Sequence, residues 1–199
     1  MKRVVVCCLA LGFAVYLASP WAVAQQPLVI KSLAERKVQE LPPGELFWRI
    51  ENFDSLADAK AAEGPWSLVA ESAGKVWLFT LGPPGNSSSA KGAKIADVGP
   101  IPRINATQYL LRINDASGPP GSVTAVHSHP GSEAFFVLTG EQSIRGAQGT
   151  LRVKAGQAEA GQGAESAMQV SSSGPTDLHA LVMFVVDAGR PFSSPATMP

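Results

Sequence analysis

Glycine and proline interrupt this chain at short intervals, and this constrains its fold more than any other feature. The 199 residues include 19 glycines and 16 prolines with no repeating period. Both residue types favour turns, so the chain suits many short strands better than long helices. After residue 107, segments rich in strand-forming residues alternate with Gly, Pro or Ser clusters: 109–113, 122–129, 134–139, 141–145, 150–153, 168–171 and 178–186. Regularly spaced short strands predict an all-β sandwich or barrel.

Composition narrows the class of protein further. Hydrophobic residues make up 45% of the chain and charged residues 16%, with a formal net charge of zero. Disordered proteins combine low hydrophobicity with high net charge, so most of this chain is expected to fold. Nucleic-acid and membrane-surface binding need a concentrated positive field, which a neutral chain without a basic run does not provide. We therefore expect neither nucleic acid nor, once its leader is removed, a membrane as a partner.

The first 24 residues have the pattern of a secretory signal peptide. Lys2 and Arg3 precede an apolar stretch over 4–18, and Ala22-Val23-Ala24 fits the small-residue pattern at a cleavage site. Both cysteines lie inside this leader, so cleavage after Ala24 would leave a thiol-free chain. The expected location is secreted, in a bacterial periplasm. Without cysteine, the remaining metal ligands are His, carboxylate and Met.

The mature chain divides into three expected regions. Residues 25–104 read as an N-terminal extension, 105–190 as the barrel, and 191–199 as a tail over the surface. Within the extension, 31–40 is a possible short helix, while 45–53 and 75–81 read as strands. Asp54 or Ser55 can cap a helix that Gly64-Pro65 would stop.

Two of the three histidines form the main candidate for chemistry. His127 and His129 are two residues apart in an expected strand, so their side chains share a face. A tight turn at 130–132 would place Glu133 nearly opposite His129 on the returning strand. Two imidazoles and one carboxylate can hold a divalent cation and leave positions open for water or substrate. The alternative is a hydrogen-bonded polar cluster without metal.

These residues also carry a family resemblance. Gly121, His127, His129, Glu133 and Gly140 have the spacing G-x5-H-x-H-x3-E-x6-G, which resembles the first signature motif of the cupin superfamily. The resemblance covers about 107–186. It implies a single-domain double-stranded β-helix, a small barrel whose ligand site lies inside on these strands.

The second cupin motif is degenerate in this chain. Between Glu133 and Leu178 there is no histidine, and a register with one extra residue places Met168 where that motif has its histidine. A thioether is a soft and weak metal ligand. With Met168 in place of the usual histidine, the sequence does not distinguish among Fe, Mn, Zn, Ni and Cu as the bound divalent ion. His179, on the next strand, is an alternative fourth ligand. The other interpretation is that His179 is a core or rim residue without a role in metal binding.

Alternation along the strand of Glu133 predicts that its face lines the cavity. Phe135, Val137 and Thr139 share that face, which makes the expected cavity narrow and largely apolar. Further polar side chains are candidates to face a substrate, although each is more often a rim residue: Tyr109, Arg112, Glu165 and Gln169.

Three classes of function remain open on the sequence. The chain can be a metal-dependent enzyme for a small molecule, a non-catalytic binding module that holds a small ligand with or without a metal, or a scaffold for association, because fold alone does not choose among them. A homodimer is expected, with the extension strands near 45–50 and 75–81 covering an exposed sheet edge of the partner.

Overall fold

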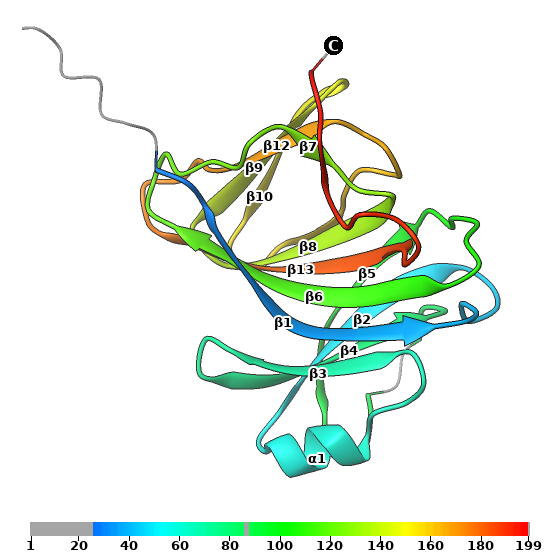
Figure 1. The fold of residues 1–199 in the computed structure, drawn as a ribbon. Helices are drawn as coiled ribbons and strands as arrows, with labels where there is room; N and C mark the ends of the chain where they lie inside the picture. Colours follow the sequence, from blue (N-terminus) through cyan, green and yellow to red (C-terminus); the bar gives the residue numbers. More distant parts are fainter. Residues whose placement is uncertain (1–25, 86–87, 199) are drawn as a thin grey trace, which may run out of the picture.

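The computed structural model describes residues 26–85 and 88–198, which form three antiparallel sheets and one short helix (Figure 1). The predicted signal peptide lies outside the described residues. Two five-stranded sheets face each other in the upper part of Figure 1, and a four-stranded sheet lies below them. The predicted all-β class is confirmed.

The barrel strands pair in a nested order. Strand β6 pairs with β13, β7 with β12, β8 with β11, and β9 with β10. Their bounds are β6 Tyr109–Gly118, β7 His127–Ser128, β8 Gly131–Thr139, β9 Glu141–Gly146, β10 Gly149–Lys154, β11 Ala158–Ala160, β12 Met168–Ser172 and β13 Leu178–Asp187. A long hairpin wound over two facing sheets is the double-stranded β-helix, so the predicted barrel topology is confirmed.

One of the two barrel sheets has a hydrophobic core on each of its faces. One five-stranded sheet has the order β1-β6-β13-β8-β11 and the other β10-β9-β12-β7-β14, with β1 at Val29–Val38 and β14 at Ser194–Pro195. Between the two sheets, the side chains of Phe135, Ile144, Val182 and Phe184 are buried together. Alternate residues of the same strands point outward, where Phe136 and Leu181 join a second core.

The N-terminal extension supplies the other half of that second core. Its sheet has the order β3-β4-β2-β5, with bounds β2 Leu46–Phe53, β3 Ser67–Ser72, β4 Lys75–Gly82 and β5 Ala93–Ile101. Trp48, Trp77 and Phe79 are almost completely buried, and the Trp77 ring meets Phe136 edge-on at 6.1 Å. Burying a large apolar side chain contributes about 1.5–3 kcal/mol. Hydrophobic packing therefore fixes this sheet on the barrel.

The single helix of the described chain is where the sequence placed it. Helix α1 spans Leu56–Ala61, and the Ser55 hydroxyl accepts a hydrogen bond from the amide of Asp58 at 3.1 Å. A side chain that satisfies a free N–H in the first turn is a typical N-cap. Of the two predicted caps, Ser55 is the one used.

The possible helix over 31–40 is wrong. These residues form strand β1, which pairs with β6 from Val29 to Val38. Pairing with β6 satisfies the backbone groups on one side of β1, and Leu33, Ala34 and Val38 add apolar contacts to the core beside the extension. Tertiary pairing thus overrides a weak local preference for helix.

The chain around the histidines also differs from the prediction. Only His127–Ser128 of the expected strand 122–129 forms a strand, and β7 and β8 lie in different sheets. The segment 130–132 is therefore no hairpin turn. Gly131 already pairs with Val186 of β13, and a Cβ on Gly131 would lie 2.1 Å from the Val185 carbonyl oxygen. The missing side chain lets the chain cross directly from one sheet to the other.

The two extension strands expected to cover a partner's sheet edge are not edge strands. Strands β2 and β4 are the central pair of their sheet, so their backbones are paired on both sides within the chain. This pairing does not support edge covering by these two strands, and the homodimer itself stays a prediction. In the described part of the chain, β1 ends its sheet instead, and it exposes Val29 and Ile30.

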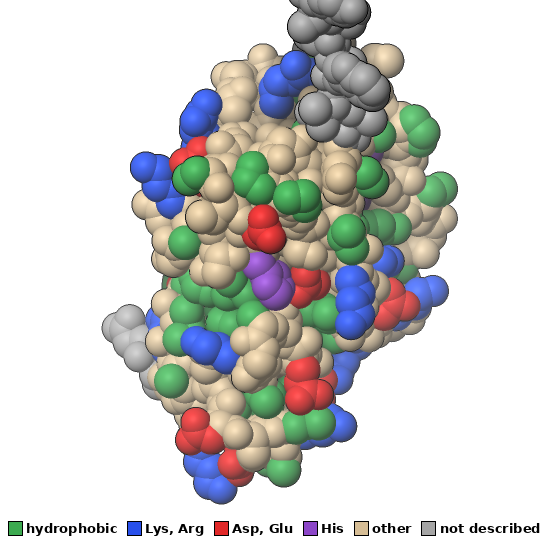
Figure 2. Space-filling view, turned by 90° about the vertical axis from the view of Figure 1, so that its left-hand side faces the viewer, with side chains coloured by type: hydrophobic (Ala, Val, Ile, Leu, Met, Phe, Trp, Pro, Cys, Tyr) green, Lys and Arg blue, Asp and Glu red, His purple; other side chains and the backbone are tan. Residues whose placement is uncertain are grey.

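On the face shown in Figure 2, Lys and Arg side chains are interspersed with Asp and Glu side chains. Among the helices of the described residues, none has the length and apolar character needed to cross a membrane.

Candidate metal and ligand site

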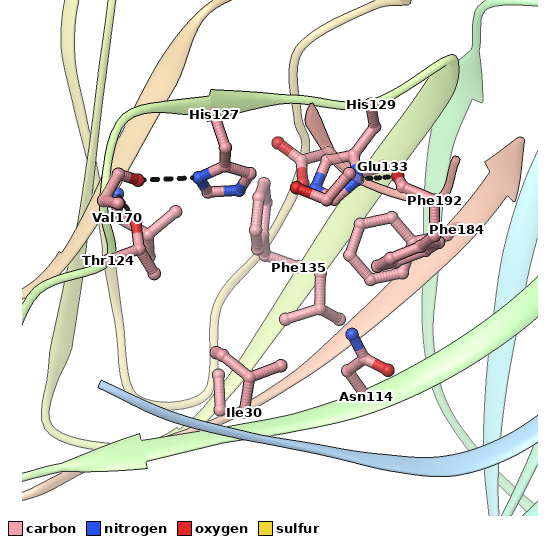
Figure 3. A pocket seen from close by; sticks show the side chains of 14 residues that line it. Ile30, Asn114, Thr124, His127, His129, Glu133, Phe135, Val170, Phe184 and Phe192 are labelled. Atoms are coloured by element: carbon pink, nitrogen blue, oxygen red, sulfur yellow. Dashed lines mark hydrogen bonds between the residues drawn. The ribbon is translucent and has the colours of Figure 1, made fainter. Parts of the chain in front are cut away.

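A cavity of about 290 Å³ lies inside the barrel between the two facing sheets. Both predicted histidines and Glu133 line it (Figure 3). Its remaining walls are mostly apolar, and its full lining is Ile30, Asn114, Ala116, Thr124, Ala125, His127, His129, Glu133, Phe135, Val170, Val182, Phe184, Phe192 and Ser193. An apolar cavity with a few convergent polar groups is the usual form of a small-molecule site.

Backbone carbonyls hold both imidazoles in place. Nδ1 of His127 lies 2.8 Å from the carbonyl oxygen of Ala125, and Nδ1 of His129 lies 2.6 Å from that of Phe192. The two rings meet edge-on with their centroids 5.0 Å apart. Since a carbonyl oxygen only accepts, each Nδ1 is the donor, and Nε2 of each neutral ring carries the free lone pair.

Burial also keeps His129 neutral. Its side chain is only 5% exposed, between the rings of Phe184 and Phe192. This desolvation lowers the pKa of His129 to about 4, although the hydrogen bond to Phe192 acts in the opposite direction. A metal ligand must be an unprotonated nitrogen with an oriented ring, and His129 meets both conditions at neutral pH.

Glu133 is the buried acid of the site. It is 2% exposed, and its Oε1 has no hydrogen-bond partner among the described residues. Burial raises the pKa of Glu133 to about 8, with a smaller opposing effect from the backbone of Gln162. Gly161 closes the site from outside, because a Cβ there would lie 2.7 Å from Cγ of Glu133. An orphaned buried carboxyl beside two oriented imidazoles has the chemistry of a cation ligand.

The three side chains share the cavity without converging on one point. Within the described residues, no group of three His, Cys, Asp or Glu side chains is close enough together to hold a metal ion as it stands. The donor types suit a divalent ion, but their present positions do not form one shared site. Shared ligation would need a rotation of the side chains toward one another.

Neither predicted fourth ligand faces the cavity. Met168 pairs with His127 across β12 and β7, but its side chain is 1% exposed in the barrel core and is not part of the cavity lining. His179 lies on the outer side of its sheet. Its Nε2 is 2.5 Å from Asp115 Oδ2 and 3.0 Å from the Ser72 hydroxyl of β3.

Of the three residues of β8 predicted to line the cavity, only the first one does so. Phe135 lines the cavity, Val137 is buried in the barrel core beyond it, and Thr139 is exposed at the strand end. The cavity therefore covers a shorter part of this face of β8 than the alternation of side chains predicted.

Of the four polar residues named as candidates to face a substrate, Arg112 and Glu165 lie next to the site. The Arg112 guanidinium stacks over the Phe192 ring at 4.2 Å, and the Glu165 amide donates to the His129 carbonyl at 2.9 Å. Tyr109 instead packs in the core beside the extension, and Gln169 donates to the Thr124 carbonyl at 3.1 Å.

Sequence reasoning missed the contribution of the tail. Phe192 and Ser193 line the cavity, and β14 pairs with β7, so the tail covers the histidines. Asn114 on β6 was also missed, although it is a polar residue within an otherwise β-forming run. Distance along the chain hides the contribution of the tail, because 63 residues separate His129 from Phe192.

Comparisons with known proteins found similarity to solved structures only at the level of the fold. No protein-family model and no curated protein matches the chain. Among 195 matching solved structures is a double-stranded β-helix protein from Klebsiella pneumoniae, with 24% identity over 44% of this chain and 75% of that one, at a TM-score of 0.37.

Two further solved structures show the range of these similarities. A cupin-like protein from Thermotoga maritima shares 16% identity over 44% of this chain and 65% of its own, at a TM-score of 0.38. A DMSP lyase from Ruegeria pomeroyi shares 20% over 43% of each chain, at a TM-score of 0.37. The chain thus spans less than half of the lyase. Its own strand pairing defines it as a double-stranded β-helix with a cavity between its two sheets.

Proposed function

We propose that this protein binds a divalent metal ion through His127, His129 and Glu133 and uses the surrounding cavity to bind or transform a small molecule. The bound ion would act as a Lewis acid for an oxygen of that molecule. The histidines and Glu133 would hold the ion, and the apolar walls would exclude water from it.

The orientation of the imidazoles is the observation that carries this proposal. Metal-binding histidines commonly donate their second ring nitrogen to a carbonyl, which fixes the ring and leaves the other nitrogen for the ion. Both cavity histidines make this bond through Nδ1. The buried carboxyl of Glu133, with its unpartnered oxygen, would supply the negative charge of the site on losing its proton to the incoming ion.

Metal loading of the purified protein tests the proposal. After treatment with chelator and incubation with Fe(II), Mn(II), Zn(II), Ni(II) or Cu(II), we expect one ion per chain by elemental analysis of the desalted protein. His127→Ala and His129→Ala should each abolish retention. His179→Ala is the matched control, because the third histidine lies on the other side of the sheet and should leave retention unchanged.

Met168→Leu tests for thioether ligation. Because Met168 does not line the cavity, we expect this variant to retain the same ions as the wild type. A selective loss of copper would instead assign Met168 to the site. Loss of metal in His179→Ala but not in His127→Ala would refute the proposed ligand set.

A metal-free binding module is the second candidate, favoured by the absence of a converged ligand group in the described residues. With a pKa of about 8, Glu133 is mostly protonated at neutral pH and can donate a hydrogen bond to a ligand. Complete failure to retain any of the five metals, together with small-molecule binding in the cavity, would select this candidate.

Two further expectations complete the proposal. We propose export to a bacterial periplasm with cleavage after Ala24, so the intact mass of the exported protein should correspond to a chain that begins at Gln25.

We also propose a homodimer through the edge of β1, where Val29 and Ile30 are exposed. Light scattering should give twice the chain mass, and Ile30→Lys should give the single chain mass.

A further inference from the structure

The cavity has another buried polar group, on the sheet that also carries Glu133 but two strands away from it. Asn114 lies on β6, is 2% exposed and lines the cavity among apolar side chains. In the strand register Asn114 faces Val182 of β13, and Val182 faces Phe135 of β8. Two strand spacings of about 4.8 Å therefore separate the backbone of Asn114 from β8, the strand that carries Glu133.

Arg112 determines which way the Asn114 amide points. Nε of Arg112 donates to Oδ1 of Asn114 at 2.9 Å. A guanidinium has no acceptor, so the amide oxygen must face it and the flipped amide is excluded. Figure 3 shows the amide nitrogen of Asn114 turned to the side of the cavity where Phe135 and Phe184 lie. The bond from Arg112 occupies the amide oxygen, so the amide nitrogen is the group that Asn114 presents to the cavity.

Arg112 is itself held by two other contacts. Its guanidinium lies over the Phe192 ring at 4.2 Å, and Nη1 is 3.7 Å from the Glu35 carboxylate. Glu35 is 57% exposed, so solvent screens its charge more than that of Arg112, whose side chain is 23% exposed. A fixed donor in an apolar cavity beside a positive charge favours an acceptor that is neutral or anionic.

We propose that Asn114 is a ligand-binding residue that selects a small, largely apolar molecule bearing a carbonyl or carboxylate oxygen. The amide nitrogen donates to that oxygen, and the apolar part of the molecule lies against Phe135 and Phe184. Arg112 is a positioning residue that holds the amide in the donating orientation. The inference rests on the proposed function only in taking this cavity as the ligand site.

Three probes of similar size separate the possible chemistries. Phenylacetate carries a carboxylate, phenylacetamide a neutral carbonyl, and phenethylamine a cation. Titration by calorimetry or ligand-observed NMR, with chelator present, should detect the two oxygen-bearing probes and not phenethylamine. A preference for phenylacetate over phenylacetamide would identify the carboxylate as the natural group, and the reverse would identify the carbonyl.

Substitutions at Asn114 test the contact itself. Asn114→Leu keeps the approximate shape and should weaken both oxygen-bearing probes by about tenfold, the effect of losing one hydrogen bond. Asn114→Asp should reverse the selection, so that phenethylamine binds and phenylacetate does not. Circular dichroism and the thermal midpoint identify any variant that fails to fold. Thr150→Val, at an exposed position of β10 outside the cavity lining, is a polar-to-apolar control and should bind the probes as wild type does.

Arg112→Met tests the positioning role. A freed amide can turn its oxygen into the cavity, so discrimination between phenylacetamide and phenethylamine should shrink although Asn114 is intact. The inference is overturned if Asn114→Leu binds the oxygen-bearing probes as well as wild type, if phenethylamine binds wild type best, or if neither oxygen-bearing probe binds at millimolar concentration. Metal retention by Asn114→Leu should equal wild type, so failure of this inference is distinguishable from failure of the metal proposal.

Discussion

Among single residues, Glu133 shows most clearly how burial disfavours a charged side chain. Its folded pKa of about 8 lies above the ordinary value of 4.5. The unfolded chain therefore releases this proton first as pH rises, so the stability contributed by the protonated group is complete below pH 4.5 and is lost toward pH 8. A shift of this size corresponds to a few kcal/mol.

Glu133→Gln should remove that loss. Glutamine keeps the shape without an ionisable proton, so the chelator-treated variant should unfold at a higher temperature than wild type at pH 8 and at a similar temperature under acid conditions. Thermal midpoints across the pH range measure this. Glu159→Gln, at an exposed position of β11, is the control and should follow wild type. Parallel pH curves for Glu133→Gln and wild type would contradict the burial argument.

The same carboxyl should control the pH dependence of metal affinity. Ligation needs ionised Glu133, so affinity should rise as pH increases toward about 8. His129 stays neutral down to about pH 4, so its protonation does not limit binding over this range. Calorimetric titration at several pH values measures the slope, and Glu133→Gln should bind weakly with a flatter dependence. A wild-type affinity that is constant between neutral pH and pH 8 would contradict ligation by a carboxyl that is still protonated at neutral pH.

At the scale of elements, the tail segment after β13 sets the environment of His129. The Phe192 ring lies 4.7 Å from the His129 ring and helps to desolvate it. Phe192→Ala keeps the backbone carbonyl but admits water, so the pKa of His129 should rise from about 4 toward its ordinary value. NMR titration of the imidazole measures the shift. Thr197→Ala, at an exposed tail position, should leave it unchanged.

The entry into β8 depends on one residue without a side chain. Because a Cβ on Gly131 would lie 2.1 Å from the carbonyl oxygen of Val185, Gly131→Ala must displace β8 from β13. We expect a loss of stability of about 3 kcal/mol or more, together with weaker metal retention, since Glu133 follows on the same strand. Chemical denaturation measures the loss. Gly163→Ala has open space for its methyl group and should be close to neutral.

At the scale of the whole molecule, the extension and the barrel share one core and should unfold together. All three tryptophans of the described residues lie in the extension, so their fluorescence reports on that part, while the imidazole resonances of the cavity histidines report on the barrel. The two denaturation curves should coincide. Phe136→Ala, which removes the barrel's contact with Trp77, should shift both by about 3–5 kcal/mol. Separate transitions would show two independent units.

The sequence by itself determined the elements with strong local signals. Frequent glycine and proline predicted the all-β barrel, Ser55 was one of the two predicted caps of α1, and strands such as β4 followed from runs of β-forming residues. The spacing of His127, His129 and Glu133 also predicted that they share one site. These features depend on contacts between neighbours along the chain, and a sequence records such contacts directly.

Tertiary structure decided whatever depends on distant pairing. Strand β1 formed because β6 offered it a partner, against a weak helical pattern. Crossing between sheets, rather than a hairpin, brought His129 and Glu133 together, and the tail supplied the carbonyl that orients His129. The outward position of His179 and the inward position of Asn114 likewise follow from which sheet face meets which core. Such long-range choices result from the packing of whole sheets, because burial of a face is decided by what covers it.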